Sequence, residues 1–144
     1  MEKERRLSFT DICFSSFTGA SDFWVLSINL SSGEVDVVTL VKKTVICLNQ
    51  RERSSIEKRL FECHIEEWED KYERPFYDAF RWSLTLCNGD TEIKNISGAN
   101  DYPHSNQWRP FIALIQRLYD RTIKDGKTEL FPSFNTPYGT DKGK

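Results

Sequence analysis

The chain has 144 residues, a net charge of −2 and 29% charged residues of both signs. Domains that bind nucleic acid usually present a concentrated basic surface, so this balance predicts no nucleic-acid partner. The sequence contains no run of ~18 apolar residues, the length that crosses a membrane, and its charged first six residues are not followed by the apolar run of a secretion signal. We therefore expect a cytoplasmic protein without membrane contact.

The composition indicates one folded domain. Hydrophobic residues make up only 38% of the chain, but ten Phe, five Tyr and four Trp are among them. Each aromatic side chain buries a large area, so a core of ordinary size is expected. We assign residues 1–126 to a single domain. Residues 127–144 contain prolines and glycines and show little periodicity, which predicts an extended or disordered C-terminal tail.

The first part of the chain predicts a β-meander. Strands are expected at residues 7–14, 23–30 and 34–41, and residues 15–22 predict a loop. Two lysines interrupt the third strand, which we expect to resume at residues 44–48 after a β-bulge.

A helix is predicted to follow the meander. Asn49 and Glu52 have the spacing of a capping box, in which each side chain binds the backbone amide of the other residue. The helix is expected to fray near residues 63–65. The charged segment 66–77 predicts an irregular connection, because Pro75 is not tolerated in the interior of a helix.

A β-hairpin is predicted next. Apolar and polar residues alternate over residues 80–86, the period of a strand with one buried face. Asn88 and Gly89 form a dipeptide that favours two-residue turns, because both residues tolerate a positive φ. After a second strand, residues 97–103 (SGANDYP) predict a polar loop in which Gly98 adopts a positive φ.

The last predicted element is a helix that begins near residues 106–108. Pro110 is expected in its first turn, where a missing amide costs nothing, and Gly126 is expected to end it. Taken together, the elements predict an α+β fold: an antiparallel β-sheet in the order βββ-α-ββ-α, with two helices packed on one face.

The hairpin and the last helix carry a motif, W-x-L…G…I…G-x-N-x-Y-P, followed by an aromatic residue and an amphipathic helix. The chain thereby resembles a group of small uncharacterised bacterial α+β proteins, mainly of the Gram-positive type, and the resemblance covers roughly residues 9–119. It implies a fold and assigns no activity. Two features depart from the group: a longer loop at residues 104–107, and Pro110 in place of a helix former. The matching positions are Trp82, Leu84, Gly89, Asn100, Tyr102, Pro103, Trp108 and Phe111.

The polar loop is the first candidate site. Its hydroxyl, amide and carboxylate side chains lead into a helix N-terminus, whose free amides attract anions. A small polar or anionic ligand, such as a nucleotide or a signal molecule, suits this chemistry. Bonds between these side chains and their own backbone explain the same composition without a ligand, and we favour that explanation. The candidate ligand-binding residues are Ser97, Asn100, Asp101, Tyr102, His104 and Arg109.

An acidic segment is the second candidate site. Four carboxylates surround a tryptophan there, and an exposed tryptophan often anchors a protein interface. A run of charges is more often simply a solvated surface, which is the alternative we favour for this segment. The candidate interface residues are Trp68, Glu66, Glu67, Glu69 and Asp70.

Catalytic and metal chemistry have little support in the sequence, which contains only two histidines. A dyad between His104 and either Cys87 or Asp101 is one open alternative. The four cysteines are far apart in the sequence, which predicts reduced thiols and not a zinc site. We expect no metal and no cofactor.

These observations favour a non-enzymatic intracellular binding protein that acts through protein–protein contact, as immunity, inhibitor and accessory proteins do. Its expected partner is another protein, and self-association into a homo-oligomer is compatible with the composition. The alternative is a protein that binds a small ligand through residues 97–109. A hydrolase or transferase built around His104 is a third hypothesis.

Overall fold

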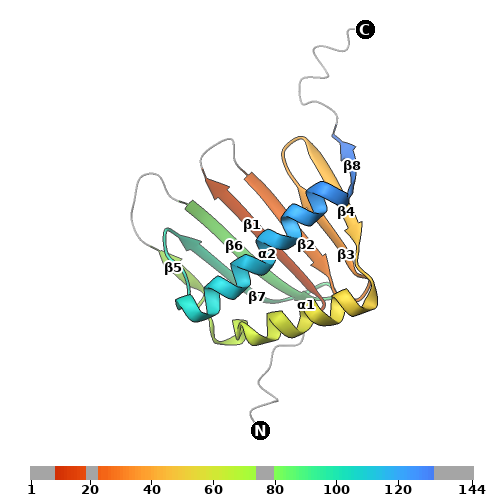
Figure 1. The fold of residues 1–144 in the computed structure, drawn as a ribbon. Helices are drawn as coiled ribbons and strands as arrows, with labels where there is room; N and C mark the ends of the chain where they lie inside the picture. Colours follow the sequence, from red (N-terminus) through yellow and green to blue (C-terminus); the bar gives the residue numbers. More distant parts are fainter. Residues whose placement is uncertain (1–8, 19–22, 74–79, 132–144) are drawn as a thin grey trace.

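The computed structural model describes residues 9–18, 23–73 and 80–131. All the strands of this part of the chain form one eight-stranded sheet, in the order β5-β7-β6-β1-β2-β3-β4-β8 (Figure 1). Neighbouring strands are antiparallel, except that β5 runs parallel to β7. The elements are β1 (Asp11–Thr18), β2 (Phe23–Asn29), β3 (Glu34–Val38), β4 (Lys42–Cys47), α1 (Gln50–Glu62), a 3-10 turn η2 (Ile65–Glu67), β5 (Lys71–Glu73), β6 (Phe80–Asn88), β7 (Thr91–Ala99), α2 (Ser105–Asp125) and β8 (Lys127–Leu130).

The predicted α+β class is confirmed, but the predicted order and helix packing are wrong. Strands β4, β5 and β8 were not predicted as separate strands. Only α2 crosses a face of the sheet, on a diagonal, whereas α1 runs along one end of the strands (Figure 1). The difference follows from the size of the apolar stripes: α1 buries only Ile56 and Leu60, whereas the 21 residues of α2 bury six side chains along its length.

The meander contains four strands because a tight turn, and not a bulge, follows β3. The Thr39 amide donates to the Lys42 carbonyl oxygen at 2.9 Å. The Thr39 hydroxyl accepts hydrogen bonds from the amides of Val41 and Lys42, which satisfies the turn. The chain therefore reverses, and both lysines lie inside β4. The first strand also lies four residues later than predicted, because residues 15–18, which were expected in a loop, pair with β6.

The capping box of α1 is confirmed. The Glu52 amide donates to Asn49 Oδ1 at 2.8 Å, and the Asn49 amide donates to Glu52 Oε1 at 2.9 Å. The helix ends at Glu62, and His64 takes a left-handed conformation with φ of 54°. The segment expected to be irregular contains η2 and β5. Residues 74–79, which include Pro75, lie outside the described residues.

The β6–β7 hairpin turns at Gly89 as predicted, with φ of 62°. The following segment differs from the prediction, because β7 continues through Ala99, so that Gly98 is a strand residue and does not have a positive φ. The indole of Trp82 lies against Gly98, where a Cβ atom would overlap it. The glycine is therefore required by packing and not by a turn.

Helix α2 begins at Ser105, slightly earlier than predicted. Pro110 is consequently its sixth residue and lies beyond the first turn, which corrects the prediction. Gly126 ends the helix as expected, and its amide donates to the Thr122 carbonyl oxygen at 2.8 Å. The segment predicted as a tail begins with β8, which pairs with β4. Residues 132–144 lie outside the described residues.

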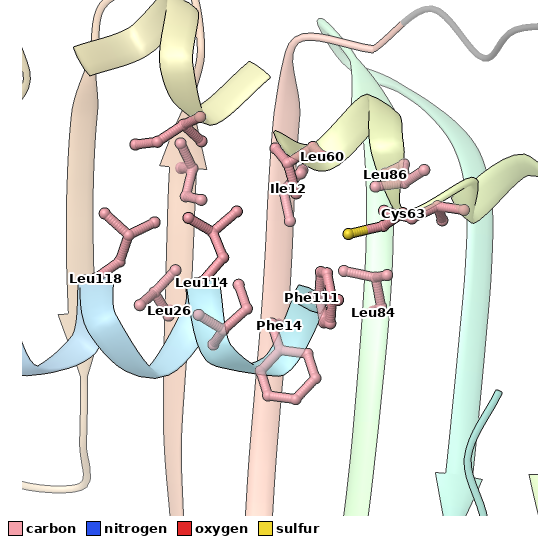
Figure 2. Close-up of a cluster of buried hydrophobic side chains, with 14 of the residues drawn as sticks. Ile12, Phe14, Leu26, Leu60, Cys63, Leu84, Leu86, Phe111, Leu114 and Leu118 are labelled. Carbon is pink, nitrogen blue, oxygen red and sulfur yellow. The ribbon is translucent and has the colours of Figure 1, made fainter. Parts of the chain in front are cut away.

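The core lies between α2 and the sheet, and α1 closes it at one end. Figure 2 shows Phe111 of α2 directed towards Phe14 of β1 and Leu84 of β6. The rings of Phe14 and Phe111 lie 5.6 Å apart in an edge-on arrangement, a favourable geometry for aromatic pairs. Leu60 of α1 reaches the same cluster beside Ile12 (Figure 2). None of the helices in the described ranges is long and apolar enough to cross a membrane.

Candidate functional site

The face of the sheet opposite α2 is covered by no helix from the described ranges, and we call it the open face (Figure 1). Side chains alternate across the sheet, so each strand contributes to both faces. On β1, Ile12 and Phe14 are buried in the core, whereas Cys13 and Ser15 on the open face are partly exposed. At this part of β1 the open face therefore carries small and polar side chains, and further along the strands it also includes Val25 and Val38.

Strand register brings polar residues from distant parts of the sequence together on the open face. Cys13 of β1 lies opposite Ser27 of β2 and Thr85 of β6. Asp36 of β3 lies on the other side of Ser27. At the end of the same strands, Asp11 lies opposite Asn29 and Cys87, and Glu34 lies opposite Cys47.

A pocket of about 320 Å³ is hollowed into the open face over β1, β2, β3 and β6. Three carboxylates line it, and no lysine or arginine of the described residues does so. Carboxylates and neutral acceptors that outnumber the nearby cations attract positively charged groups. The polar groups that define this acidic pocket are Asp11, Glu34, Asp36, Ser27, Asn29 and Thr85.

Asp36 is the carboxylate of the acidic pocket whose pKa is raised by its surroundings. Burial raises the pKa of Asp36, the ammonium group of Lys43 lowers it, and the carboxylate of Glu34 raises it further, for a net increase. The ionised form of Asp36 is therefore disfavoured by its surroundings in the isolated chain. A cation placed in the pocket would relieve this cost, because an opposite charge stabilises the ionised carboxylate.

Two thiols, Cys13 and Cys87, line the acidic pocket. Burial, together with the negative charges of Glu92 and Asp11, raises the pKa of the Cys87 thiol. Cys13 accepts a hydrogen bond from the Ser27 hydroxyl at 3.7 Å. Because the thiolate is the nucleophilic form of cysteine, a raised pKa leaves Cys87 poorly suited to nucleophilic chemistry at neutral pH.

The predicted ligand-binding loop uses its side chains to hold its own backbone. Asn100 has a positive φ of 58°, and its Oδ1 accepts a hydrogen bond from the Phe80 amide at 3.0 Å. Asp101 Oδ1 accepts from the Tyr102 amide at 3.0 Å, and His104 Nδ1 accepts from the Asn106 amide at 3.3 Å. These bonds are the Asx-type and capping interactions that polar loops commonly form.

The six predicted loop residues do not line one common binding site. Ser97 lies on β7 opposite Ser83, on the open face. The ring of Tyr102 packs between Phe80 and Trp108, with centroid distances of 6.0 and 5.0 Å. Arg109 is exposed on α2. One feature of the loop is unsatisfied, because Asn100 Nδ2 is buried without a hydrogen-bond partner in the described part of the chain.

The acidic segment has a buried tryptophan and exposed carboxylates. Trp68 is only 2% exposed, and its indole nitrogen donates to the Cys63 carbonyl oxygen at 3.1 Å. Trp68 therefore belongs to the core and does not present an interface anchor. Glu67 accepts a hydrogen bond from Gln107 Nε2 at 3.1 Å, and Asp70 lies 3.8 Å from Lys94 Nζ. Glu66 lies 3.4 Å from His64, and Glu69 is exposed.

His64, Glu66 and Glu67 are the side chains among the described residues that come closest to a metal-ligand arrangement. Their ligand atoms lie within 4.8 Å of one another. Two carboxylates and one imidazole suit a divalent transition metal. Both His64 and Glu67 are exposed, and such surface groups are common without a bound ion.

Comparison of the sequence with protein-family models gave no match, and comparison with curated proteins also gave none. The candidate sites are therefore ranked by their geometry alone. The acidic pocket is the largest departure from the sequence prediction, since none of its carboxylates was a candidate and only Cys87 of its lining had been considered, as a partner of His104. The signal was present in the strand alternation, where polar residues occupy the positions between buried ones. It was missed because only the strand register shows that Asp11 and Asp36 share a face.

Proposed function

We propose that this chain is a non-enzymatic intracellular binding protein that receives a basic segment of another protein on its open face. The observation that supports the proposal is the acidic pocket: Asp11, Glu34 and Asp36 line a hollow in an uncovered sheet face, and no lysine or arginine of the described residues lines it, although Lys43 acts on Asp36 from outside the lining. A lysine or arginine side chain of a partner would add positive charge to a hollow that holds three carboxylates, and arginine forms paired hydrogen bonds with carboxylates.

The surroundings of the acidic pocket favour a protein partner over a small molecule. Beyond the pocket, the open face continues as a row of hydroxyl groups, in which Ser15 and Ser83 are hydrogen bonded at 2.6 Å and Ser97 lies opposite Ser83. Small side chains allow a partner backbone to approach closely, and their hydroxyls offer both donors and acceptors. An extended surface of this kind fits a protein segment that enters the pocket with one basic side chain.

A second acidic surface competes with the open face for the same role. Glu66, Glu67, Glu69 and Asp70 lie near the N-terminal end of α2, on the segment that the sequence singled out. Three of these carboxylates already have partners: Glu66 with His64, Glu67 with Gln107 and Asp70 with Lys94. We place the partner at the acidic pocket because its three carboxylates share one hollow.

The experiment is gentle recovery of the tagged protein from its own cells, followed by native mass spectrometry. The test variant carries Asp11→Asn, Glu34→Gln and Asp36→Asn, which remove three charges and preserve side-chain size. The matched control carries Glu66→Gln, Glu69→Gln and Asp70→Asn. We expect a stoichiometric second chain with the wild type and the control, and its loss with the test variant. If the test variant kept the second chain and the control variant lost it, the interface would lie on the acidic segment and not on the open face.

A small-ligand function at residues 97–109 is the second candidate. The observation that favours it is the buried, unpartnered Nδ2 of Asn100 near the start of α2. Asn100→Asp replaces the Nδ2 donor with a negatively charged oxygen, so it removes the donor and repels an anion, while the other oxygen can still accept from the Phe80 amide. If Nδ2 binds an anion, a nucleotide that raises the melting temperature of the wild type should not stabilise the variant. Equal stabilisation of both proteins would remove this site from consideration.

A further inference from the structure

Strand β8 forms one edge of the sheet, and all four of its residues are exposed. An edge strand presents unpaired backbone amides and carbonyls, which can pair with another strand. We propose that β8 pairs in an antiparallel manner with β8 of a second copy of this chain, so that two sheets join across a two-fold axis. Two properties of β8 identify a second copy as the pairing strand: the direction of its free backbone groups and the arrangement of its charges.

Hydrogen bonds of the described residues show which backbone groups of β8 are free. The Phe131 amide donates to the Val41 carbonyl oxygen at 2.8 Å, so Phe131 directs its backbone groups towards β4. Backbone groups alternate in direction along a strand, and Glu129 and Lys127 therefore also face β4. The groups of Thr128 and Leu130 face the free edge.

Self-pairing centred on Thr128 uses these free groups. The amide and carbonyl of Thr128 would exchange two hydrogen bonds with the same groups of the other copy. Leu130, which is 73% exposed, would come opposite Gly126 of the other copy and lose part of that exposure. Gly126 has extended backbone angles, φ of −80° and ψ of 166°, so it can continue the strand.

This register also pairs opposite charges. Lys127 lies one residue before Thr128 and Glu129 one residue after it, so each Lys127 comes opposite Glu129 of the other copy. Such a pair does not exchange backbone hydrogen bonds, and its side chains are therefore at the closer of the two cross-strand spacings. Within the chain, Glu129 already lies opposite Lys43 on β4, and Lys127 lies opposite Val45. Glu129 would thus sit between two lysines.

Charged residues on an edge strand often prevent pairing with another strand. The arrangement of the charges decides whether they prevent self-pairing of β8 or support it. Two lysines, or two glutamates, would repel in a self-paired strand. One lysine and one glutamate on either side of a central threonine attract, because antiparallel self-pairing is isologous: each residue that contacts the second copy is contacted in return. The sequence of β8 is therefore self-complementary in a register that its free amides allow, whereas the register that pairs Thr128 with Leu130 of the other copy would place the two Glu129 side chains opposite each other.

The joined sheet would have a consequence for binding. A two-fold axis between antiparallel strands is perpendicular to the sheet, so both open faces lie on the same side. If the proposed function holds, two acidic pockets then face a partner together, which raises avidity. The self-association itself does not depend on that function, because neither Asp36 nor the other pocket carboxylates belong to β8.

Sedimentation velocity of the full chain at increasing concentration tests the proposal. The wild type should shift from a 16.9 kDa monomer to a species of twice that mass. Lys127→Glu and Glu129→Lys should each weaken dimerisation about tenfold, because two attractive pairs become repulsive. An equimolar mixture of the two variants should restore the dimer, since all cross-strand pairs are again opposite in charge. Glu57→Lys, an exposed change on α1, is the control and should have no effect.

Three results would overturn the proposal. The first is a wild type that remains monomeric up to a concentration of about 1 mM, at which even weak specific dimers form. Alternatively, a dimer would form but resist both charge reversals, which would place the interface elsewhere. Finally, a monomer whose Thr128 and Leu130 amides exchange slowly with solvent would show that another segment of the same chain already occupies the edge.

Discussion

The indole ring of Trp82 on β6 occupies the space that a side chain at Gly98 on β7 would fill. The two residues lie opposite each other in the register of the hairpin, and Trp82 is 2% exposed. We predict that Gly98→Ala destabilises the protein by about 1–3 kcal/mol, the usual cost of overpacking a core. Chemical denaturation of the variant and the wild type measures this difference.

The destabilisation caused by Gly98→Ala should depend on the indole ring of Trp82. In the background of Trp82→Leu, a smaller side chain leaves room for a methyl group, so adding Gly98→Ala should cost much less than it does in the wild type. The double-mutant cycle isolates this interaction. Equal costs in both backgrounds would mean that the backbone, and not the ring, requires glycine at position 98.

Glu52 connects the two helices, and its removal should lower stability. Its backbone hydrogen bond from Asn49 lowers the pKa of the Glu52 carboxyl, and the hydrogen bond from Arg121 of α2 at 2.6 Å lowers it further. Glu52→Ala should cost about 1 kcal/mol, in the range of lost helix caps. Thermal unfolding of the two proteins measures this change.

The pH dependence separates charge from hydrogen bonding at Glu52. A carboxyl with a lowered pKa in the folded state stabilises the protein above its ordinary pKa of about 4.3, and this contribution is lost as the pH falls below it. Glu52→Gln retains an oxygen for the Asn49 amide but has no charge to lose. The wild type should therefore lose its advantage over Glu52→Gln under acidic conditions. A constant difference between the two proteins would contradict this account.

Asp36→Asn should make the protein more stable at neutral pH. Because burial raises the pKa of Asp36, folding favours its protonated form. The stabilisation that protonation provides is present below the ordinary aspartate pKa of about 3.9 and is lost as the pH rises through the higher folded value. The advantage of the variant over the wild type should therefore be largest at neutral pH and shrink under acidic conditions. Denaturation at both pH values measures it.

The same substitution should weaken binding to a basic partner. A side chain that lowers stability and improves binding is expected where a charged group is held ready for an opposite charge. If Asp36→Asn left both stability and binding unchanged, Asp36 would have no role in the acidic pocket.

Trp68 should behave as a core residue. Trp68→Ala should cost about 3–5 kcal/mol, as do other large-to-small changes of buried aromatic residues. Trp68→Phe should cost less, because a smaller ring still fills most of the space but leaves the Cys63 carbonyl without its indole donor. Urea denaturation of both variants checks this order. A Trp68→Ala variant as stable as the wild type would indicate an exposed side chain.

Local signals in the sequence predicted the elements that depend on a few neighbouring residues. The capping box of Asn49 and Glu52, the turn at Gly89 and the helix end at Gly126 are all confirmed. Each relies on interactions within a few residues, so spacing alone reveals it. The reversal at Thr39 was missed because its turn is held by a hydroxyl in a segment of β-branched residues, which read as a continuous strand.

The tertiary arrangement could not be read from local patterns. Pro110 suggested a later helix start, but the long apolar stripe of α2 extends the helix across it. Gly98 suggested a turn, but its role is set by Trp82 from the other strand. The acidic pocket depends on register between strands that are up to 76 positions apart, such as Asp11 and Cys87. No local periodicity contains that information.

Titration of the isotope-labelled protein with a short arginine-rich peptide, followed by amide NMR shifts, tests the central claim most directly. We predict shifts concentrated at Ser27, Asp36 and Thr85 on the open face, and their loss when the three pocket carboxylates are neutralised. The same shifts should persist in the control variant with Glu66→Gln, Glu69→Gln and Asp70→Asn. Shifts confined to residues 66–70, with an undisturbed open face, would contradict it.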